Sequence, residues 1–248
     1  MAKPKVHIVD VTDFNLPDGT KSTDWFMNAF EKLDLFGRVD IESYDGTAEV
    51  FPDLDSLKEG TDGIIITGSS GAVFEEKHWI PALLEFIKDA HKRKIHMLGV
   101  CFGHHAIAVA LGGEVMMNPR GRELGTYPVY LTDEGGEDPL LGHFGFPELV
   151  NLSHRMHVTE LPEGATCLAF NQTTPVQAFR IGNSMGVQFH PELTPRELKQ
   201  LVLMFKNVLI RKENFADSEE HLERIVSSFQ QTPASMAVLE KFVASIEG

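Results

Sequence analysis

The stretch Gly99-Val100-Cys101-Phe102-Gly103 places a cysteine between two glycines at the end of an apolar run. Residues 95–100 are typical of a β-strand, and residues 102–111 have the apolar spacing of a helix. This is the layout of a nucleophile elbow, a sharp strand-to-helix turn whose small neighbours leave room for a strained nucleophile. At a helix start, free N–H groups favour a thiolate at Cys101, and the N–H of Phe102 is available to an oxyanion. The alternative interpretation of Cys101 is a buried core thiol.

A candidate base for this cysteine lies in the second half of the chain. His190-Pro191-Glu192 follows an apolar stretch, residues 185–189, that predicts a short strand. Because residues two apart in an extended segment face the same side, we expect Glu192 to lie beside His190. A carboxylate there orients the imidazole and stabilises the imidazolium formed when His190 takes the thiol proton. The sequence therefore predicts a Cys101, His190 and Glu192 triad at the carboxyl ends of strands, where sites gather in α/β sheets.

Alternation of strand and helix patterns predicts the fold class. Strand patterns at residues 6–11, 39–44 and 63–67 alternate with helical patterns at 23–36 and 78–91. Such alternation is typical of βαβ units, so we expect an α/β fold with a doubly wound, mostly parallel, flavodoxin-like sheet. After Gly113 short β-rich segments are expected to add antiparallel strands, with turns such as Glu134-Gly135-Gly136 between them. These segments are residues 126–131, 148–152, 166–170, 176–181 and 185–189.

The C-terminal part of the chain is predicted to be helical. Thr194 and Pro195 are suited to cap and open a helix over residues 195–210. Two further amphipathic patterns follow, at about residues 218–230 and 233–246. We therefore expect one domain over residues 1–212 and a helical extension over residues 213–248. The extension packs on the domain or forms a surface for a partner or a second copy in a homodimer.

Composition limits the classes of function. A chain of 248 residues with 42% hydrophobic residues can bury one large core. A net charge of −14 argues against nucleic-acid binding, which needs a dense lysine and arginine patch. Only two cysteines, Cys101 and Cys167, suit a reducing compartment. The sequence has no signal-peptide pattern and no apolar run of membrane-spanning length, so a cytoplasmic location without membrane contact is expected.

Taken together, the motifs resemble the class I, or triad, glutamine amidotransferases, including the amidotransferase domain of GMP synthetase. The resemblance covers roughly residues 5–210. It implies a γ-glutamyl thioester on Cys101, release of ammonia and hydrolysis to glutamate, with His190 as base and Glu192 as its orienter. It also implies an oxyanion hole made by two main-chain N–H groups, that of Phe102 and one from the turn after residue 67. The matching segments are Gly99 to His104, His190-Pro191-Glu192, Thr67-Gly68-Ser69-Ser70 and Ser153-His154. Within the turn, the donor is expected between Gly68 and Ser70, at Ser69.

Two residues depart from the family pattern. The family usually carries glutamine where this chain has His105, and the GMP synthetase branch carries aspartate where it has Met156. Both positions belong to the region that binds the amino-acid end of glutamine, so the substrate stays open. Ser153, His154 and Arg155 are candidate substrate-binding residues in the same region. Arg155 either grips a substrate carboxylate through two hydrogen bonds or is an ordinary surface residue.

A zinc site is an alternative for the histidines of this region, since imidazole is a common zinc ligand. The resemblance explains these histidines without a metal, so we expect no metal and no other cofactor. The histidines concerned are His104, His105, His154 and His157.

Three hypotheses for function follow from these observations. The first is a glutaminase-type amidotransferase, whose ammonia passes to a separate synthetase subunit because the chain has no room for a synthetase and no glycine-rich phosphate loop. The second is a free-standing hydrolase of γ-glutamyl peptides that uses the same thioester. The third is a catalytically silent binding or regulatory protein with the same fold. The first two take a small-molecule substrate.

Overall fold

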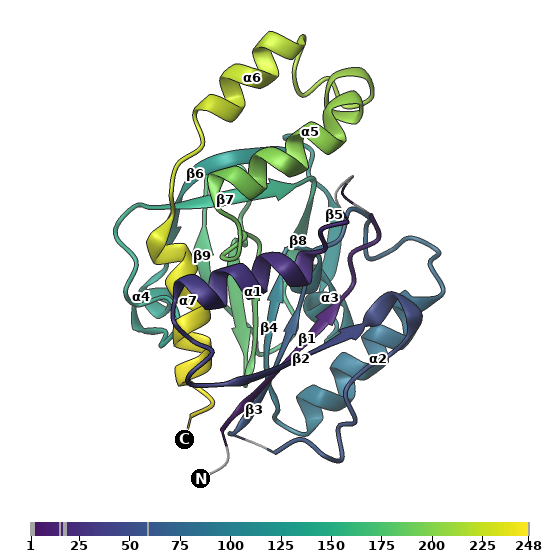
Figure 1. Ribbon diagram of the computed structural model, residues 1–248, viewed down its shortest axis with the longest axis vertical. Coiled ribbons are helices and arrows are strands. Elements are labelled where there is room, and N and C mark those ends of the chain that lie inside the picture. Colours follow the sequence, from purple (N-terminus) through teal and green to yellow (C-terminus); the bar gives the residue numbers. More distant parts are fainter. Residues whose placement is uncertain (1–2, 15, 17–18, 59, 248) are drawn as a thin grey trace.

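The computed structural model describes residues 3–14, 16, 19–58 and 60–247. These residues form a nine-stranded sheet and a separate two-stranded sheet (Figure 1). Five neighbouring strands of the large sheet are parallel: β2 (Asp40–Asp45), β1 (Lys5–Asp10), β3 (Asp62–Ile66), β4 (His96–Val100) and β11 (Ser184–Val187). Four antiparallel strands extend it: β10 (Ala178–Ile181), β9 (Thr166–Phe170), β6 (Glu123–Leu131) and β7 (Glu148–His154). The small sheet pairs β5 (Glu114–Met117) with β8 (Met156–Glu160).

Helices cover both faces of the parallel strands. Alternate strand residues face opposite sides, so Ile8 packs in one core cluster and Val9 in the other. The cluster with Ile8 contains side chains of α1 (Ser22–Lys32) and α7 (Pro233–Ala244). The cluster with Val9 contains side chains of α2 (Trp79–Lys92) and α3 (Phe102–Ala110). Burial on both faces explains why central strands such as β3 are continuous apolar runs.

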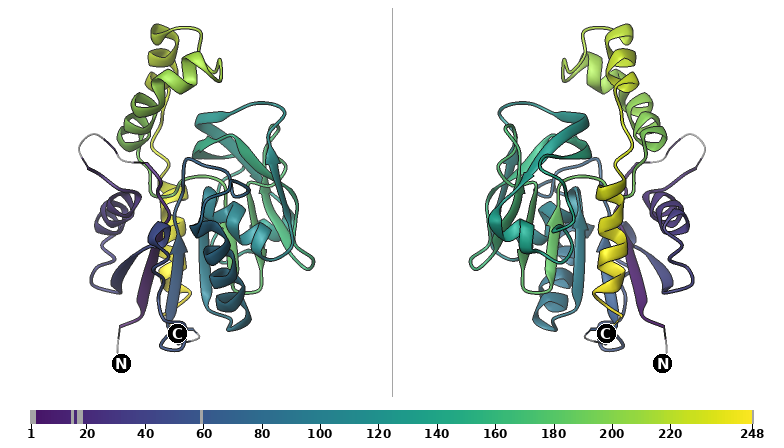
Figure 2. Two further views of the ribbon diagram at one scale, coloured as in Figure 1. Left: turned by 90° about the vertical axis from the view of Figure 1, so that its right-hand side faces the viewer. Right: turned by 90° about the vertical axis from the view of Figure 1, so that its left-hand side faces the viewer.

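The remaining helices lie at the ends of the sheet. A short 3₁₀ helix (Gly46–Ala48) follows β2, and α4 (Asp133–Glu137) follows β6. Figure 1 and Figure 2 show α5 (Pro195–Arg211) at the carboxyl edge of the parallel strands and α6 (Glu219–Ser227) projecting beyond it. The chain then returns along the sheet as α7, whose Val238, Leu239 and Phe242 are buried. The boundary of a C-terminal extension at residue 213 stays a prediction.

Three adjacent strands set up the carboxyl edge at which the predicted motifs meet. Ile66 of β3 pairs with Gly99 of β4, and Val100 of β4 pairs with Val187 of β11. The ladder continues one residue further, because the Cys101 N–H donates to the Val187 carbonyl at 2.9 Å. The segments that follow these three strands therefore emerge side by side.

The expected α/β class, with a mostly parallel sheet and antiparallel additions, is confirmed. Three local expectations differ from the structure. The segment at residues 185–189, expected among the antiparallel additions, forms β11, which is antiparallel to β10 but pairs with β4 in parallel. The predicted turn at Glu134-Gly135-Gly136 lies in α4, because the Thr132 hydroxyl accepts a hydrogen bond from the Gly135 N–H at 3.0 Å and caps a helical turn. The strand expected over residues 148–152 extends to His154, because β7 pairs along its length with β6.

Among the described residues, no helix is both long enough and apolar enough to cross a membrane. The cytoplasmic location stays a prediction.

Candidate active site

Cys101 has the strained backbone that a nucleophile elbow requires. Its φ is 51° and its ψ is −97°, in a region that non-glycine residues rarely occupy. The flanking glycines leave no room for side chains. A Cβ on Gly99 would lie 2.3 Å from the Gly103 carbonyl oxygen, and one on Gly103 would lie 2.3 Å from the Ile66 carbonyl oxygen. The elbow geometry expected from the sequence is therefore confirmed.

His190 and Glu192 form a buried pair at the end of the neighbouring strand. His190 Nδ1 lies 2.7 Å from Glu192 Oε1, and the side chains are 7% and 1% exposed. The His190 N–H of the main chain donates to the Asn151 carbonyl of β7 at 2.9 Å, which fixes the segment after β11. His190 Nε2 is buried and has no hydrogen-bond partner within the described residues. This nitrogen is left for Cys101 or a ligand.

The charges around His190 favour its protonated form. Burial alone would lower the pKa of His190, but the Glu192 carboxylate and the Cys101 sulfur outweigh it and raise the pKa to about 10. An imidazolium is therefore present at neutral pH, beside the sulfur of Cys101.

The turn after β3 lies beside both Cys101 and His190. A Cβ on Gly68 would lie 3.2 Å from His190 Cε1 and 3.7 Å from Cys101 Cβ, so the turn passes close to both residues. The Ser70 N–H and hydroxyl donate to Asp13 Oδ1 at 2.9 and 2.7 Å, which holds the turn in place. Within the described part of the chain, the N–H groups of Ser69 and Phe102 donate to no acceptor.

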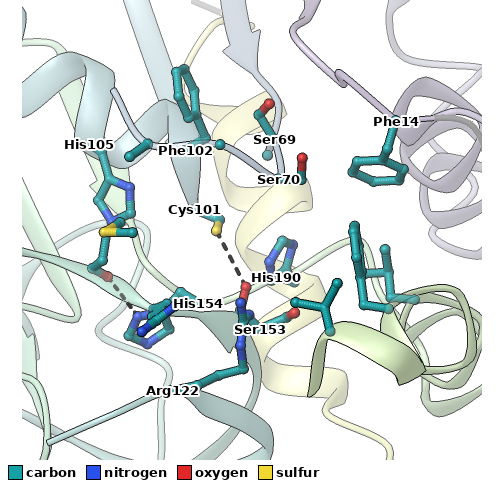
Figure 3. A pocket seen from close by; sticks show the side chains of 18 of the residues that line it. Phe14, Ser69, Ser70, Cys101, Phe102, His105, Arg122, Ser153, His154 and His190 are labelled. Carbon is teal, nitrogen blue, oxygen red and sulfur yellow. Dashed lines mark hydrogen bonds between the residues drawn. The ribbon is translucent and has the colours of Figure 1, made fainter. Parts of the chain in front are cut away.

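The segment where β7 passes into β8 forms the wall opposite this turn. The Cys101 thiol contacts the Ser153 carbonyl at 3.8 Å, as Figure 3 shows. His154 donates from Nδ1 to the Met156 carbonyl at 2.8 Å, and its Nε2 lies 3.1 Å from Glu123 Oε2. Burial alone would raise the pKa of Glu123, but His154 and other hydrogen-bond donors lower it. The Met156 carbonyl thus fixes the His154 ring, with a buried carboxylate beside it.

His105 and His104 occupy different positions in spite of being adjacent. His105 borders the cavity beside Cys101 and donates from Nε2 to Gln188 Oε1 at 2.8 Å. Burial lowers the pKa of His105 to about 3, so its ring is neutral. His104 is fully buried and packs on Phe179, with ring centroids 5.0 Å apart. Of these two histidines, His105 and not His104 is placed to contact a ligand in the cavity.

A cavity of about 420 Å³ opens above Cys101. Its size is within the range of small-molecule sites, roughly 300–1,000 Å³. All the site residues predicted from the sequence border it except Glu192, which lies behind His190. These bordering residues are Gly68, Ser69, Cys101, Phe102, His105, Ser153, His154, Arg155, Met156 and His190.

Two groups of cavity residues were not predicted from the sequence. One is an ion-pair cluster in which Arg122 contacts Glu213 through two bonds of 2.5 and 2.9 Å, with Arg155 3.6 Å from the same carboxylate. The other is an apolar wall, defined as Phe14, Trp25, Leu201, Phe205 and Val208. No spacing pattern in the sequence connects these residues, because they come from distant parts of the chain: the β1–α1 segment, α1, the segment before β6, the position between β7 and β8, α5 and the segment after α5.

Within the described residues, no three His, Cys, Asp or Glu side chains are arranged to hold a metal ion. Cys101 and Cys167 are both free thiols.

Comparison with known proteins identifies the family. The family model described as glutamine amidotransferase class-I matches residues 23–210. The chain belongs to this family. Among sequence relatives, γ-glutamyl peptidase 3 of Arabidopsis thaliana is 31% identical over 193 residues, which cover 75% of this chain and 73% of that protein. A GMP synthase of Leifsonia xyli is 38% identical over 145 residues, which cover 57% of this chain but 28% of the synthase.

Solved structures agree on the fold of this family member. The structure of SMU.1228c superposes with a TM-score of 0.74 at 20% identity, covering 98% of this chain and 100% of that one. A glutamine amidotransferase from Thermotoga maritima gives a TM-score of 0.71 at 18% identity, covering 98% and 99% of the two chains. The resemblance to class I glutamine amidotransferases expected from the sequence is therefore confirmed.

Proposed function

We propose that this chain hydrolyses γ-glutamyl amide bonds through a covalent thioester on Cys101. The observation that carries the proposal is the strained elbow of Cys101, with the buried pair of His190 and Glu192 on the adjacent strand. Membership of the class I glutamine amidotransferases supports the same chemistry. A silent binding protein would have no need for a strained cysteine beside a charged histidine.

In the proposed reaction, the Cys101 thiolate attacks the γ-carbonyl carbon of the substrate. The N–H groups of Phe102 and Ser69 stabilise the resulting oxyanion. As the C–N bond breaks, the His190 imidazolium gives its proton to the leaving amine, and a γ-glutamyl thioester remains on Cys101. Neutral His190 then takes a proton from water, whose oxygen attacks the thioester. Glutamate is released, and the Cys101 thiolate and the His190 imidazolium are restored.

The substrate is proposed to be a γ-glutamyl peptide, and two observations support this choice. The relatives named γ-glutamyl peptidases match over most of their length, whereas the synthases match over about a third or less. The cavity of about 420 Å³ also extends well beyond the immediate surroundings of the sulfur. Hydrolysis of glutamine, with ammonia passed to a separate synthetase subunit, is the second candidate, and the similarity to GMP synthases favours it.

Arg155 is proposed to bind a carboxylate of the substrate. Glu213 is already engaged by Arg122 through two short bonds, while Arg155 approaches it only at 3.6 Å. The Arg155 guanidinium therefore keeps donors for another carboxylate, and its side chain is 38% exposed. The cluster of two arginines and one glutamate carries a net positive charge, which suits an anionic substrate.

The test of the proposed function is a substrate screen. Purified full-length protein is incubated with glutamine and with a series of γ-glutamyl dipeptides, and free glutamate is measured by mass spectrometry. We expect glutamate from the dipeptides at a higher kcat/KM than from glutamine. Faster cleavage of glutamine would favour the second candidate, and absence of cleavage from every donor would contradict the proposal.

A further inference from the structure

One side of the cavity is apolar, and its chemistry differs from that of the rest. The apolar wall joins the segment before α1 to helix α5. The Phe14 ring stands edge-on to Phe205 with centroids 5.6 Å apart, and lies 6.3 Å from the Trp25 ring. Trp25 and Leu201 are buried, whereas Phe14, Phe205 and Val208 are only partly buried and border the cavity. Apolar surface is thus presented to whatever fills this part of the site.

The apolar wall lies on the side of Cys101 where the reaction releases its amine. In Figure 3, Phe14 and His190 lie on one side of Cys101, and His105 and His154 lie on the other. His190 is the group that protonates the leaving nitrogen, so the substituent on that nitrogen must extend toward the side of His190. The γ-glutamyl part of the substrate then occupies the polar side, near His105 and His154.

Ammonia has no substituent that such a wall would contact. An apolar side chain on the leaving amine would remove both its own surface and that of the wall from water, which stabilises the bound state. A charged or very small side chain gains nothing from this contact, and a charged one loses hydration. The leaving amine that fits best is therefore an amino acid or peptide whose first side chain is large and apolar.

We propose that the apolar wall is a specificity site for the leaving group, and that the preferred substrates are γ-glutamyl peptides with an aromatic or branched aliphatic residue after the γ-glutamyl group. This inference rests on the proposed function, because it assumes cleavage of the γ-glutamyl bond at Cys101. Phe205 and Val208 of α5, with Phe14, recognise the side chain. They take no part in the proton transfers.

The experiment compares kcat/KM for γ-glutamyl-phenylalanine, γ-glutamyl-leucine and γ-glutamyl-glycine with the full-length protein. We expect the first two to exceed the third by roughly 10-fold to 100-fold, the usual scale for discrimination by an apolar pocket. Equal values for all three dipeptides would overturn the inference while leaving the proposed function in place. If the protein cleaves none of the three dipeptides and does not cleave glutamine, the proposed function itself is overturned.

Three variants of α5 test whether the apolar wall causes the preference for large apolar side chains. Phe205→Ala should reduce the preference for phenylalanine over glycine roughly tenfold. Val208→Phe should narrow the site, so that the phenylalanine dipeptide loses kcat/KM and the glycine dipeptide keeps it. Leu203→Ala is the matched control, because Leu203 is 53% exposed on the same helix and does not border the cavity. It should leave the preference unchanged.

Because Phe205→Ala removes packing from a core cluster, its folding is checked by thermal unfolding. The Val208→Phe variant removes no side chain and keeps the test decisive if Phe205→Ala is unstable. If Val208→Phe leaves the ratio of kcat/KM between the phenylalanine and glycine dipeptides unchanged, whether or not all three dipeptides lose activity equally, the inference is contradicted.

Discussion

His190 Nδ1 lies 2.7 Å from Glu192 Oε1 across a single proline, with both side chains almost wholly buried. Proline disfavours the helical region for His190 and restricts its own φ, so the segment stays open enough for the two side chains to meet. Burial alone would lower the pKa of His190, and the carboxylate together with the Cys101 sulfur raises it to about 10. The His190 imidazolium therefore keeps a positive charge beside the Cys101 sulfur over the whole neutral range.

The pH dependence of activity should report this pair. Because His190 must be protonated to release the amine, and its pKa is raised, kcat/KM should persist above neutral pH and fall only as pH approaches about 10. Glu192→Gln removes the main group that raises this pKa. The alkaline limb of the kcat/KM profile of Glu192→Gln should therefore move to lower pH, toward the ordinary histidine pKa of about 6.5. The limb is a property of the coupled groups, and it is measured as kcat/KM from about pH 5 to pH 11.

Substitutions of His190 and of Glu192 should lower kcat at neutral pH by different amounts. His190→Ala removes the acid and base itself and should lower kcat by about 10²-fold to 10⁴-fold. Glu192→Gln keeps the imidazole of His190 and removes only the charged group beside it. Its loss of kcat should therefore be smaller than that of His190→Ala. Initial rates with a γ-glutamyl dipeptide test the order. A larger loss in Glu192→Gln would mean that the carboxylate has a more direct role than orientation.

Gly99→Ala should destabilise the fold. The new Cβ would lie 2.3 Å from the Gly103 carbonyl oxygen, which is main chain and cannot move aside. Overpacking of this kind costs roughly 1–3 kcal/mol or more in the free energy of unfolding. Gly37→Ala is the control, because its Cβ would have no neighbour within 4 Å. Denaturant unfolding measures both, and equal midpoints for the two variants would contradict the close approach in the elbow.

Asp13→Ala should slow turnover by loosening the turn that carries Ser69. Partial burial alone would raise the pKa of Asp13, but hydrogen bonds from Lys77 and Ser70 lower it to about 2, so the anchor is ionised at neutral pH. We expect kcat to fall about 10-fold to 100-fold, below the roughly 10²-fold to 10³-fold cost of removing an oxyanion donor outright.

Ser70→Ala keeps the main-chain hydrogen bond to Asp13 at 2.9 Å, so its kcat should fall less than that of Asp13→Ala. In both variants KM should change little, since the turn acts on the transition state. A change in KM with kcat unchanged would show that the turn serves substrate binding instead.

The parts of the site that the sequence predicted are those encoded locally. Cys101 is identifiable because its glycine neighbours and the strand-to-helix change are adjacent in sequence, and Glu192 because it is two residues from His190. The parallel sheet was also predictable, because each βαβ unit produces its own alternation of patterns. These features need no knowledge of distant contacts.

The remaining walls of the cavity depend on tertiary structure. Arg122 and Glu213 lie 91 positions apart and meet only because the segment before β6 and the segment after α5 come together. Phe14 and Phe205 are brought together by the packing of α5 near the carboxyl edge. Their sequence neighbourhoods have no motif, so residues that bear on substrate choice are found only in the folded chain.

Glutamate release by Cys101→Ala and Cys167→Ala tests the central claim most directly. Both cysteines are free, but burial raises the pKa of Cys167, which favours its thiol form. With a γ-glutamyl dipeptide, Cys167→Ala should cleave at the rate of the unaltered protein, and Cys101→Ala should lose activity by at least about 10⁴-fold. Retained cleavage in folded Cys101→Ala would contradict a thioester at the elbow.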